Sequence, residues 1–92
     1  MASFCAMDTR QIIGWNLRRI RVAQNVSQER LALEAVIDRA YVGRVERGSE
    51  NVTVATLEAL AKVLQVPIVE LFKEPKNPGP MPRLRAGRKP LR

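Results

Sequence analysis

The sequence contains no histidine and a single cysteine, Cys5. These absences exclude a zinc site built from cysteine and histidine, a nucleophile activated by histidine, and an internal disulfide. No apolar run approaches the ~18 residues of a membrane span, and the N-terminus lacks the basic start and apolar core of a signal peptide. We therefore expect a cytoplasmic protein without a metal, a cofactor or a membrane partner, and no small-molecule ligand is evident.

Aromatic residues are also scarce, because only Phe4, Trp15, Tyr41 and Phe72 are available to fill a core. With 92 residues, of which 46% are hydrophobic, the chain can still bury a modest core within one domain. The sequence has no glycine-rich phosphate loop and no recognisable pair of cleft carboxylates. Since it also lacks histidine, an enzyme is the least expected class of protein.

Positive charge is concentrated near the C-terminus. Residues 1–72 hold nine Lys and Arg against eight Asp and Glu, whereas residues 73–92 hold seven against one. A basic excess of this kind indicates nucleic acid as a partner. The body of the chain is nearly neutral, however, so a DNA-binding role has to depend on where its own arginines lie.

Proline is almost confined to the same end, since five of the six prolines follow Phe72. Proline lacks a backbone N–H and interrupts helices, so residues 74–92 are expected to form a disordered basic arm. Residues 1–8 are expected to be an N-terminal extension and residues 9–73 the folded domain.

Helical periodicity runs through the whole expected domain, and no strand pattern competes with it. Ile13, Leu17 and Ile20, for example, fall on one helical face. Capping residues, glycine and proline divide the pattern into five helices, namely residues 9–24 after Asp8, 28–35 after Ser27, 39–47 after Asp38, 54–64 after Thr53, and 67–72 beginning at Pro67. The predicted fold class is therefore all-α.

The second and third expected helices are separated by only about three residues, at 36–38. Two short helices joined so tightly must cross at a steep angle, which is the helix-turn-helix geometry. Such a crossing needs a small residue where the backbones approach, and Ala32 supplies it.

The third expected helix has two unlike sides. Val42 and Val45 define its inward direction. A helical wheel then places Ala40, Gly43, Arg44 and Arg47 near the opposite pole, with Arg39 and Tyr41 on the flanks. An exposed face of arginines and small residues can enter the major groove of DNA, where arginine binds guanine O6 and N7 through two parallel hydrogen bonds.

The chain resembles the Cro/repressor (XRE-type) helix-turn-helix family in three segments, SQERLA from Ser27, YVGRVERG from Tyr41 and LEALAKVL from Leu57. The resemblance covers about residues 11–72 and implies a λ-repressor-like, DNA-binding transcription regulator. Residues 38–43 and 46–51 are further similar to the controller proteins of restriction–modification systems, which are small dimeric regulators. The basic arm is not part of that pattern.

The resemblance also implies roles for individual residues. It assigns base reading to Arg39, Ala40, Tyr41, Gly43 and Arg44, and phosphate binding to Ser27, Gln28, Arg47, Asn51 and Thr53. It implies a buried ion pair between Arg21 and Glu46. It implies a dimer interface formed by Ile68, Val69, Leu71 and Phe72, although Ile68 and Phe72 could instead close the core of the monomer.

Two positions depart from the family pattern. Val36 stands in the helix-turn-helix turn where a glycine with positive φ is usual, and a β-branched residue is poorly suited to that conformation. Either the turn is strained or it takes another shape. Gln65 likewise replaces a common glycine after the fourth expected helix.

These observations predict a homodimeric regulator that binds double-stranded DNA at a roughly palindromic operator, with one recognition helix per subunit in major grooves ~34 Å apart. An alternative is a protein-interaction module, such as a coactivator or an antitoxin-like adaptor, in which the helix-turn-helix is only a scaffold. A further alternative is a nonspecific nucleic-acid binder that depends on the arm alone.

Overall fold

A computed structural model describes residues 8–75 of the chain. The predicted extension up to residue 7 and the predicted basic arm from residue 76 onward lie outside these residues. The described chain forms four α-helices followed by a 3-10 helix, namely α1 (Thr9–Ala23), α2 (Gln28–Ala35), α3 (Arg39–Glu46), α4 (Val54–Leu64) and η1 (Ile68–Phe72). No strand occurs within residues 8–75, so the all-α prediction is confirmed for this part of the chain.

The expectation of five helices is corrected at the C-terminal end. The last segment is a 3-10 helix, and Pro67 precedes it as its N-cap with extended backbone angles (φ −65°, ψ 147°) instead of beginning the helix. Gln24 and Arg47 are cap residues, so α1 and α3 each end one residue earlier than expected.

The N-termini of three α-helices are capped as the sequence indicates. The Asp8 carboxylate accepts a hydrogen bond from the Gln11 amide at 3.0 Å, and the Gln11 side chain accepts one from the Asp8 amide, which completes a capping box. Ser27 and Thr53 accept the corresponding amide hydrogen bonds at the starts of α2 and α4. Asp38 occupies the N-cap position of α3, but its side chain makes no capping hydrogen bond.

Every α-helix described ends in a Schellman motif, in which the amides of a left-handed residue and of the residue after it donate to carbonyls of the last helical turn. The residues in the left-handed conformation are Asn25 (φ 62°), Val36 (φ 59°), Gly48 (φ 78°) and Gln65 (φ 58°). The turn at Val36 therefore keeps the shape for which glycine is suited, although valine occupies it. Of the two possibilities that the sequence leaves open, the strained turn is the one observed.

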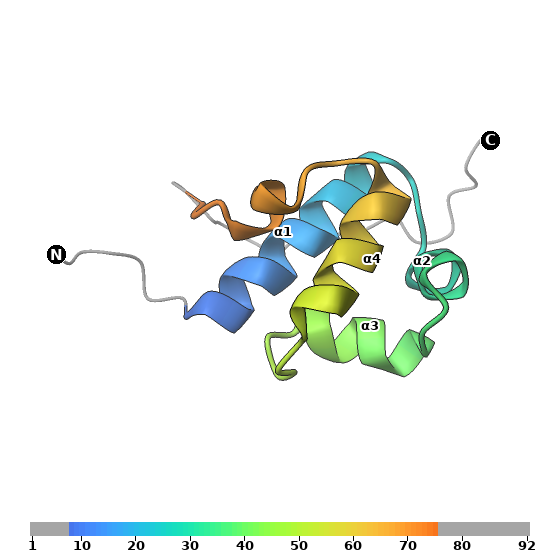
Figure 1. Ribbon diagram of the computed structural model, residues 1–92, viewed down its shortest axis with the longest axis horizontal. Coiled ribbons are helices and arrows are strands. Elements are labelled where there is room, and N and C mark those ends of the chain that lie inside the picture. The colour runs from blue at the N-terminus through green and yellow to red at the C-terminus, as the bar shows by residue number, and fades with distance from the viewer. Residues whose placement is uncertain (1–7, 76–92) are drawn as a thin grey trace, which may run out of the picture.

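The helices pack around one apolar core (Figure 1). α1 packs against both α3 and η1, while α2 packs against α3 and α4. Figure 1 shows α2 almost end-on and α3 lying across the view, which is the steep crossing expected of a helix-turn-helix. The buried apolar residues are Ile13, Leu17, Ile20, Leu31, Ala32, Val42, Val45, Leu57, Leu60, Ala61, Leu64 and Leu71.

Gly14 sets how closely α1 approaches the end of α3. A Cβ atom added at this position would lie 2.4 Å from the carbonyl oxygen of Val45 and 2.6 Å from that of Glu46. Both contacts are with backbone atoms, which cannot rotate away. The two helices can therefore lie at this distance only because residue 14 has no side chain.

A buried ion pair joins the same two helices. The guanidinium of Arg21 on α1 donates to the carboxylate of Glu46 on α3 from Nε at 2.6 Å and from Nη2 at 3.0 Å. The two residues are 4% and 2% exposed. Arg21 also donates from Nη1 to the Val26 carbonyl at 2.8 Å, and Gln28 on α2 donates to Glu46 Oε1 at 2.9 Å. One carboxylate thus connects α1, α2 and α3.

Replacing Val36 by glycine should stabilise the domain. The left-handed conformation costs a residue with a side chain ~1–2 kcal/mol, and glycine would remove this cost. Part of the resulting stabilisation is offset because glycine is freer in the unfolded chain. We expect the free energy of unfolding in urea to rise by ~0.5–1 kcal/mol. Leu33→Gly, at an exposed interior position of α2, is the control and should lower it by ~1 kcal/mol. A loss of stability in both variants would contradict the assignment of strain to Val36.

Replacing Glu46 by glutamine should destabilise the domain strongly. The substitution leaves the buried Arg21 guanidinium without its counter-charge, and breaking a buried pair in this way costs ~3–5 kcal/mol. The matched control is Glu34→Gln, which breaks the exposed ion pair with Arg30 on α2 and should cost ~0.3–0.5 kcal/mol. Urea unfolding of both variants measures the difference, and equal effects would show that burial of the Arg21–Glu46 pair has no energetic consequence.

Candidate nucleic-acid interface

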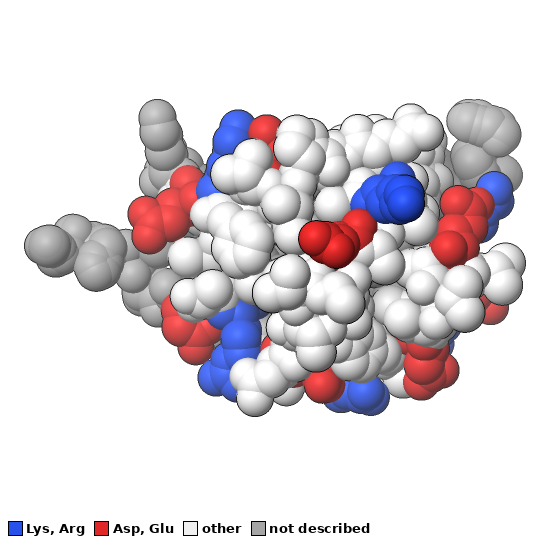
Figure 2. Space-filling model, in the orientation of Figure 1, with Lys and Arg blue, Asp and Glu red and all other residues white. Residues whose placement is uncertain are grey.

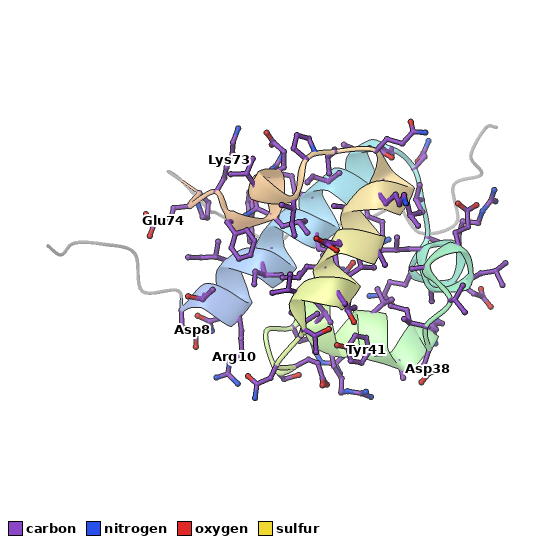
Figure 3. All side chains as sticks on the ribbon, in the orientation of Figure 1. Asp8, Arg10, Asp38, Tyr41, Lys73 and Glu74 are labelled. Carbon is purple, nitrogen blue, oxygen red and sulfur yellow. The ribbon has the colours of Figure 1, made fainter. Side chains whose placement is uncertain are left out.

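α3 lies along one edge of the domain, with Asp38 at its start and Tyr41 along its length (Figure 3). Val42 and Val45 are buried against the rest of the domain. Arg39, Ala40, Arg44 and Arg47 are exposed, and Tyr41 is half-buried. Arg39, Arg44 and Arg47, the arginines assigned to DNA, therefore all reach the surface on α3 or at its C-cap.

Gly43 is placed differently from the expectation. It is buried, not exposed on the outward pole. The buried side of α3 includes Glu46 as well as the two valines, and Gly43 lies on that wider buried side. The Arg47 and Gln28 side chains cover it, with Arg47 Nη1 3.4 Å and Gln28 Oε1 4.0 Å from the site of a Cβ atom. In this conformation Gly43 provides space for neighbouring side chains and presents little surface of its own.

Arg44 is held by two neighbours. Its Nε donates to Glu50 Oε1 at 2.8 Å, and its guanidinium carbon lies 5.6 Å from the centre of the Tyr41 ring. The hydrogen bond to Glu50 is the main reason that the pKa of Arg44 is raised above its ordinary value. Arginine is charged at physiological pH in any case, and the position of this guanidinium depends on Glu50, a residue outside α3.

Ser27 and Gln28 lie at the N-terminus of α2, where the first amides of a helix have no intrahelical partner and can bind an anion. The Ser27 hydroxyl already accepts from the Arg30 amide at 3.0 Å. The Gln28 side chain donates to Glu46 at 2.9 Å and lies against Gly43, so it braces α2 against α3.

Asn51 and Thr53 are exposed in the segment that leads into α4. Thr53 Oγ1 lies 3.1 Å from the Thr56 amide nitrogen and 3.0 Å from the Thr56 hydroxyl. This segment follows directly on the C-terminal end of α3, so a second helix N-terminus begins a few residues after the arginine-bearing face.

The four residues expected at a dimer interface divide into two groups. Leu71 is fully buried and Ile68 is partly buried against the core, so both help to close the monomer. Val69 and Phe72 are exposed, at 58% and 42%. The inclusion of Leu71 in a contact surface is therefore corrected, whereas Val69 and Phe72 remain available to a partner.

Asn16 is a buried polar residue to which no sequence motif gives a role. Its Nδ2 lies 3.0 Å from the Ile12 carbonyl oxygen, 3.1 Å from that of Leu71 and 2.7 Å from that of Lys73, and its Oδ1 accepts from Arg19 at 3.0 Å. Asn16 therefore fixes the C-terminal segment on α1. An asparagine inside an apolar helical stripe is the sequence signal that could have indicated it.

In the view of Figure 2 most charged side chains lie toward the rim, and the uncharged surface over α4 is interrupted by an acidic and a basic patch. Within residues 8–75, no helix is long and apolar enough to cross a membrane. The same part of the chain holds no group of three or more Cys, His, Asp or Glu side chains placed to bind a metal ion.

Relatives of this chain are found both by sequence and by structure. The control protein C.SmaI of Serratia marcescens is 43% identical over 71 residues, which are 77% of this chain and 84% of the relative. The crystal structure of the restriction–modification controller protein C.AhdI of Aeromonas hydrophila has a TM-score of 0.67 and 43% identity, and the match covers 68% of this chain and 96% of that one.

A further structure contains DNA. It is the tetramer of the restriction–modification controller protein C.Esp1396I in complex with its natural 35 base-pair operator, with a TM-score of 0.65, 32% identity, and coverage of 72% of this chain and 87% of that one. The family model HTH_3, described as helix-turn-helix, matches residues 17–71. The chain therefore belongs to the HTH_3 (XRE-type) family of DNA-binding transcription regulators, and its close homologues include proteins named as restriction–modification control proteins.

Proposed function

We propose that the protein is a sequence-specific transcription regulator that binds a roughly palindromic operator as a homodimer in the cytoplasm. We further propose that it controls a restriction–modification system, the role given by the names of its relatives. Residues 9–73 form the DNA-binding unit. The basic residues within 74–92 add attraction to phosphates that does not depend on sequence.

The observation that carries this proposal is the outward side of α3. Arg39, Arg44 and Arg47 are all exposed there, and the small Ala40 lies between them. Arginine is the side chain best suited to bind guanine through two hydrogen bonds, and a small residue lets the helix approach the base edges closely. The N-termini of α2 and α4 offer amides for phosphates of the same duplex. Phosphate contacts of this kind would position the domain, and Arg39 and Arg44 would read the sequence.

Self-association is supported by the surface around η1. Val69 and Phe72 expose apolar side chains on a segment that Asn16 holds against α1. Leu71, on the same segment, is buried in the core. A second copy placed on this surface would remove both exposed side chains from water, which is favourable. A two-fold dimer would then present two copies of α3 to two half-sites.

Selection of bound fragments from a random DNA pool tests this function directly. A regulator of the proposed kind enriches one motif with approximate two-fold symmetry, and its complex survives competitor DNA in a gel-shift assay. Enrichment of no motif would leave the adaptor or the nonspecific binder as the function.

Arg44→Ala should relax base preference at one position in each half-site. We expect the loss of one bidentate base contact to lower affinity for the best operator by ~1–3 kcal/mol and affinity for random DNA much less. Gln28→Ala should instead weaken binding to all sequences similarly, because a phosphate contact carries no sequence information. Fluorescence anisotropy on operator variants measures both effects. If Arg44→Ala lowered affinity equally for operator and random DNA, Arg44 would contact only phosphates.

Phe72→Ser should weaken the dimer without unfolding the monomer, because Phe72 is exposed while Leu71 beside it closes the core. We expect a larger dimer dissociation constant in analytical ultracentrifugation and weaker operator binding, with little change in the urea midpoint. Leu33→Ser removes an exposed apolar side chain from α2 instead and should leave the dimer intact. A monomeric wild type at tens of micromolar, with and without operator, would refute the interface.

A further inference from the structure

Glu50, to which the family resemblance gives no role, contacts Arg44. Arg44 Nε donates to Glu50 Oε1 at 2.8 Å, and the two side chains are 44% and 26% exposed. The contact crosses from the outward side of α3 to the segment that follows this helix. An exposed ion pair of this kind contributes little to folding stability, so its effect on the orientation of Arg44 is the more informative property.

The chain reversal after α3 brings Glu50 back to Arg44. Gly48, with φ 78°, donates its amide to the Val45 carbonyl at 3.0 Å. The Ser49 amide donates to the Arg44 carbonyl at 3.0 Å, and the Ser49 hydroxyl lies 3.2 Å from the same oxygen. These bonds attach the segment before Glu50 to the backbone of Arg44 itself. The carboxylate therefore approaches Arg44 from a fixed direction.

The contact engages only one part of the guanidinium. Glu50 takes the Nε hydrogen, and the Tyr41 ring lies beside the group at 5.6 Å. Within residues 8–75, no hydrogen bond occupies Nη1 or Nη2 of Arg44. The two terminal nitrogens form the fork that matches O6 and N7 of guanine. Arg44 is thus restrained on one edge and open on the edge that can read a base.

We propose that Glu50 is a positioning residue for base recognition, which holds the guanidinium of Arg44 so that its Nη1 and Nη2 groups meet one guanine. The proposal rests on the proposed DNA-binding function and concerns how the same face discriminates between bases. Glu50 restricts the Arg44 side chain before DNA binds, so Arg44 loses less conformational entropy on binding. More of the free energy of the bidentate contact then contributes to affinity for the correct base.

The negative charge of Glu50 has the opposite effect on binding that ignores sequence. A carboxylate beside the DNA-binding face repels phosphates, so it weakens contact with every duplex. Glu50 therefore raises discrimination while lowering general affinity. These two effects separate a positioning residue from a carboxylate that only competes with DNA for Arg44.

The test uses the full chain and the operator motif selected from a random pool, with affinities measured by fluorescence anisotropy on the motif, on motifs altered at single positions and on random duplex. The variants are Glu50→Gln, Arg44→Ala and the double substitution. Glu58→Gln is the matched control, since it removes the same charge from an exposed position on α4 that makes no ion pair within residues 8–75.

We expect Glu50→Gln to reduce discrimination by roughly 3- to 10-fold at the position that Arg44→Ala relaxes, the range that corresponds to ordering one long side chain. Affinity for random duplex should stay the same or rise. In the Arg44→Ala background, Glu50→Gln should leave discrimination unchanged, because Glu50 acts through Arg44. Glu58→Gln should not alter discrimination at any position.

Other outcomes overturn the inference. If Glu50→Gln strengthens operator binding with discrimination intact, Glu50 only competes with DNA for Arg44. If discrimination falls equally with and without Arg44, Glu50 acts on the fold or on DNA directly. A wild type that selects no motif would refute the proposed function as well. A wild type that discriminates at the Arg44 position, together with an unaltered Glu50→Gln variant, would refute the positioning role alone.

Discussion

The orientation of α3 depends on the hydrogen bonds that the buried carboxylate of Glu46 accepts from α1 and α2. A carboxylate removed from water is unfavourable unless it is paired and hydrogen-bonded, and here Arg21 meets it through two nitrogens while Gln28 donates to the same group. Because these partners lie on α1 and α2, the charge is satisfied only when all three helices are in place. Arg18 Nε lies 4.0 Å from Glu46 and makes no hydrogen bond within residues 8–75, so it adds charge near the carboxylate but no directional contact.

The same arrangement separates the side of α3 that is fixed from the side that is offered to a ligand. Val42, Val45 and Glu46 hold the helix, whereas Ala40, Arg44 and Arg47 face outward. Gln28 belongs to both sides, since it braces Glu46 from the N-terminus of α2, where a phosphate would also bind. Glu46 keeps both hydrogen bonds from Arg21 when Gln28 is replaced, so we expect α3 to stay in place and the phosphate contact to be the main loss.

Features that depend on local chemistry could be predicted from the sequence, whereas those that depend on distant partners could not. The caps at Asp8, Ser27 and Thr53 follow from the side chain and the three residues after it. The role of Gly14 depends on carbonyls of α3, and that of Asn16 on carbonyls more than fifty residues away. The contact of Glu50 with Arg44 likewise depends on the turn at Gly48, which no residue pattern of α3 alone would reveal.

Gly14 and Asn16 are only two positions apart on α1, yet they hold opposite parts of the domain. Gly14 lies against the backbone of α3, and Asn16 binds the carbonyls at the end of η1. In a dimer built on the exposed residues of η1, α1 would act as a rigid spacer between the subunit contact and the recognition helix. Moving one half-site by a single base pair shifts it by about 3.4 Å along the duplex. A close-packed helix could not change its length by that amount. The distance between half-sites that the dimer can bind would therefore be fixed by the packing of α1 within each monomer.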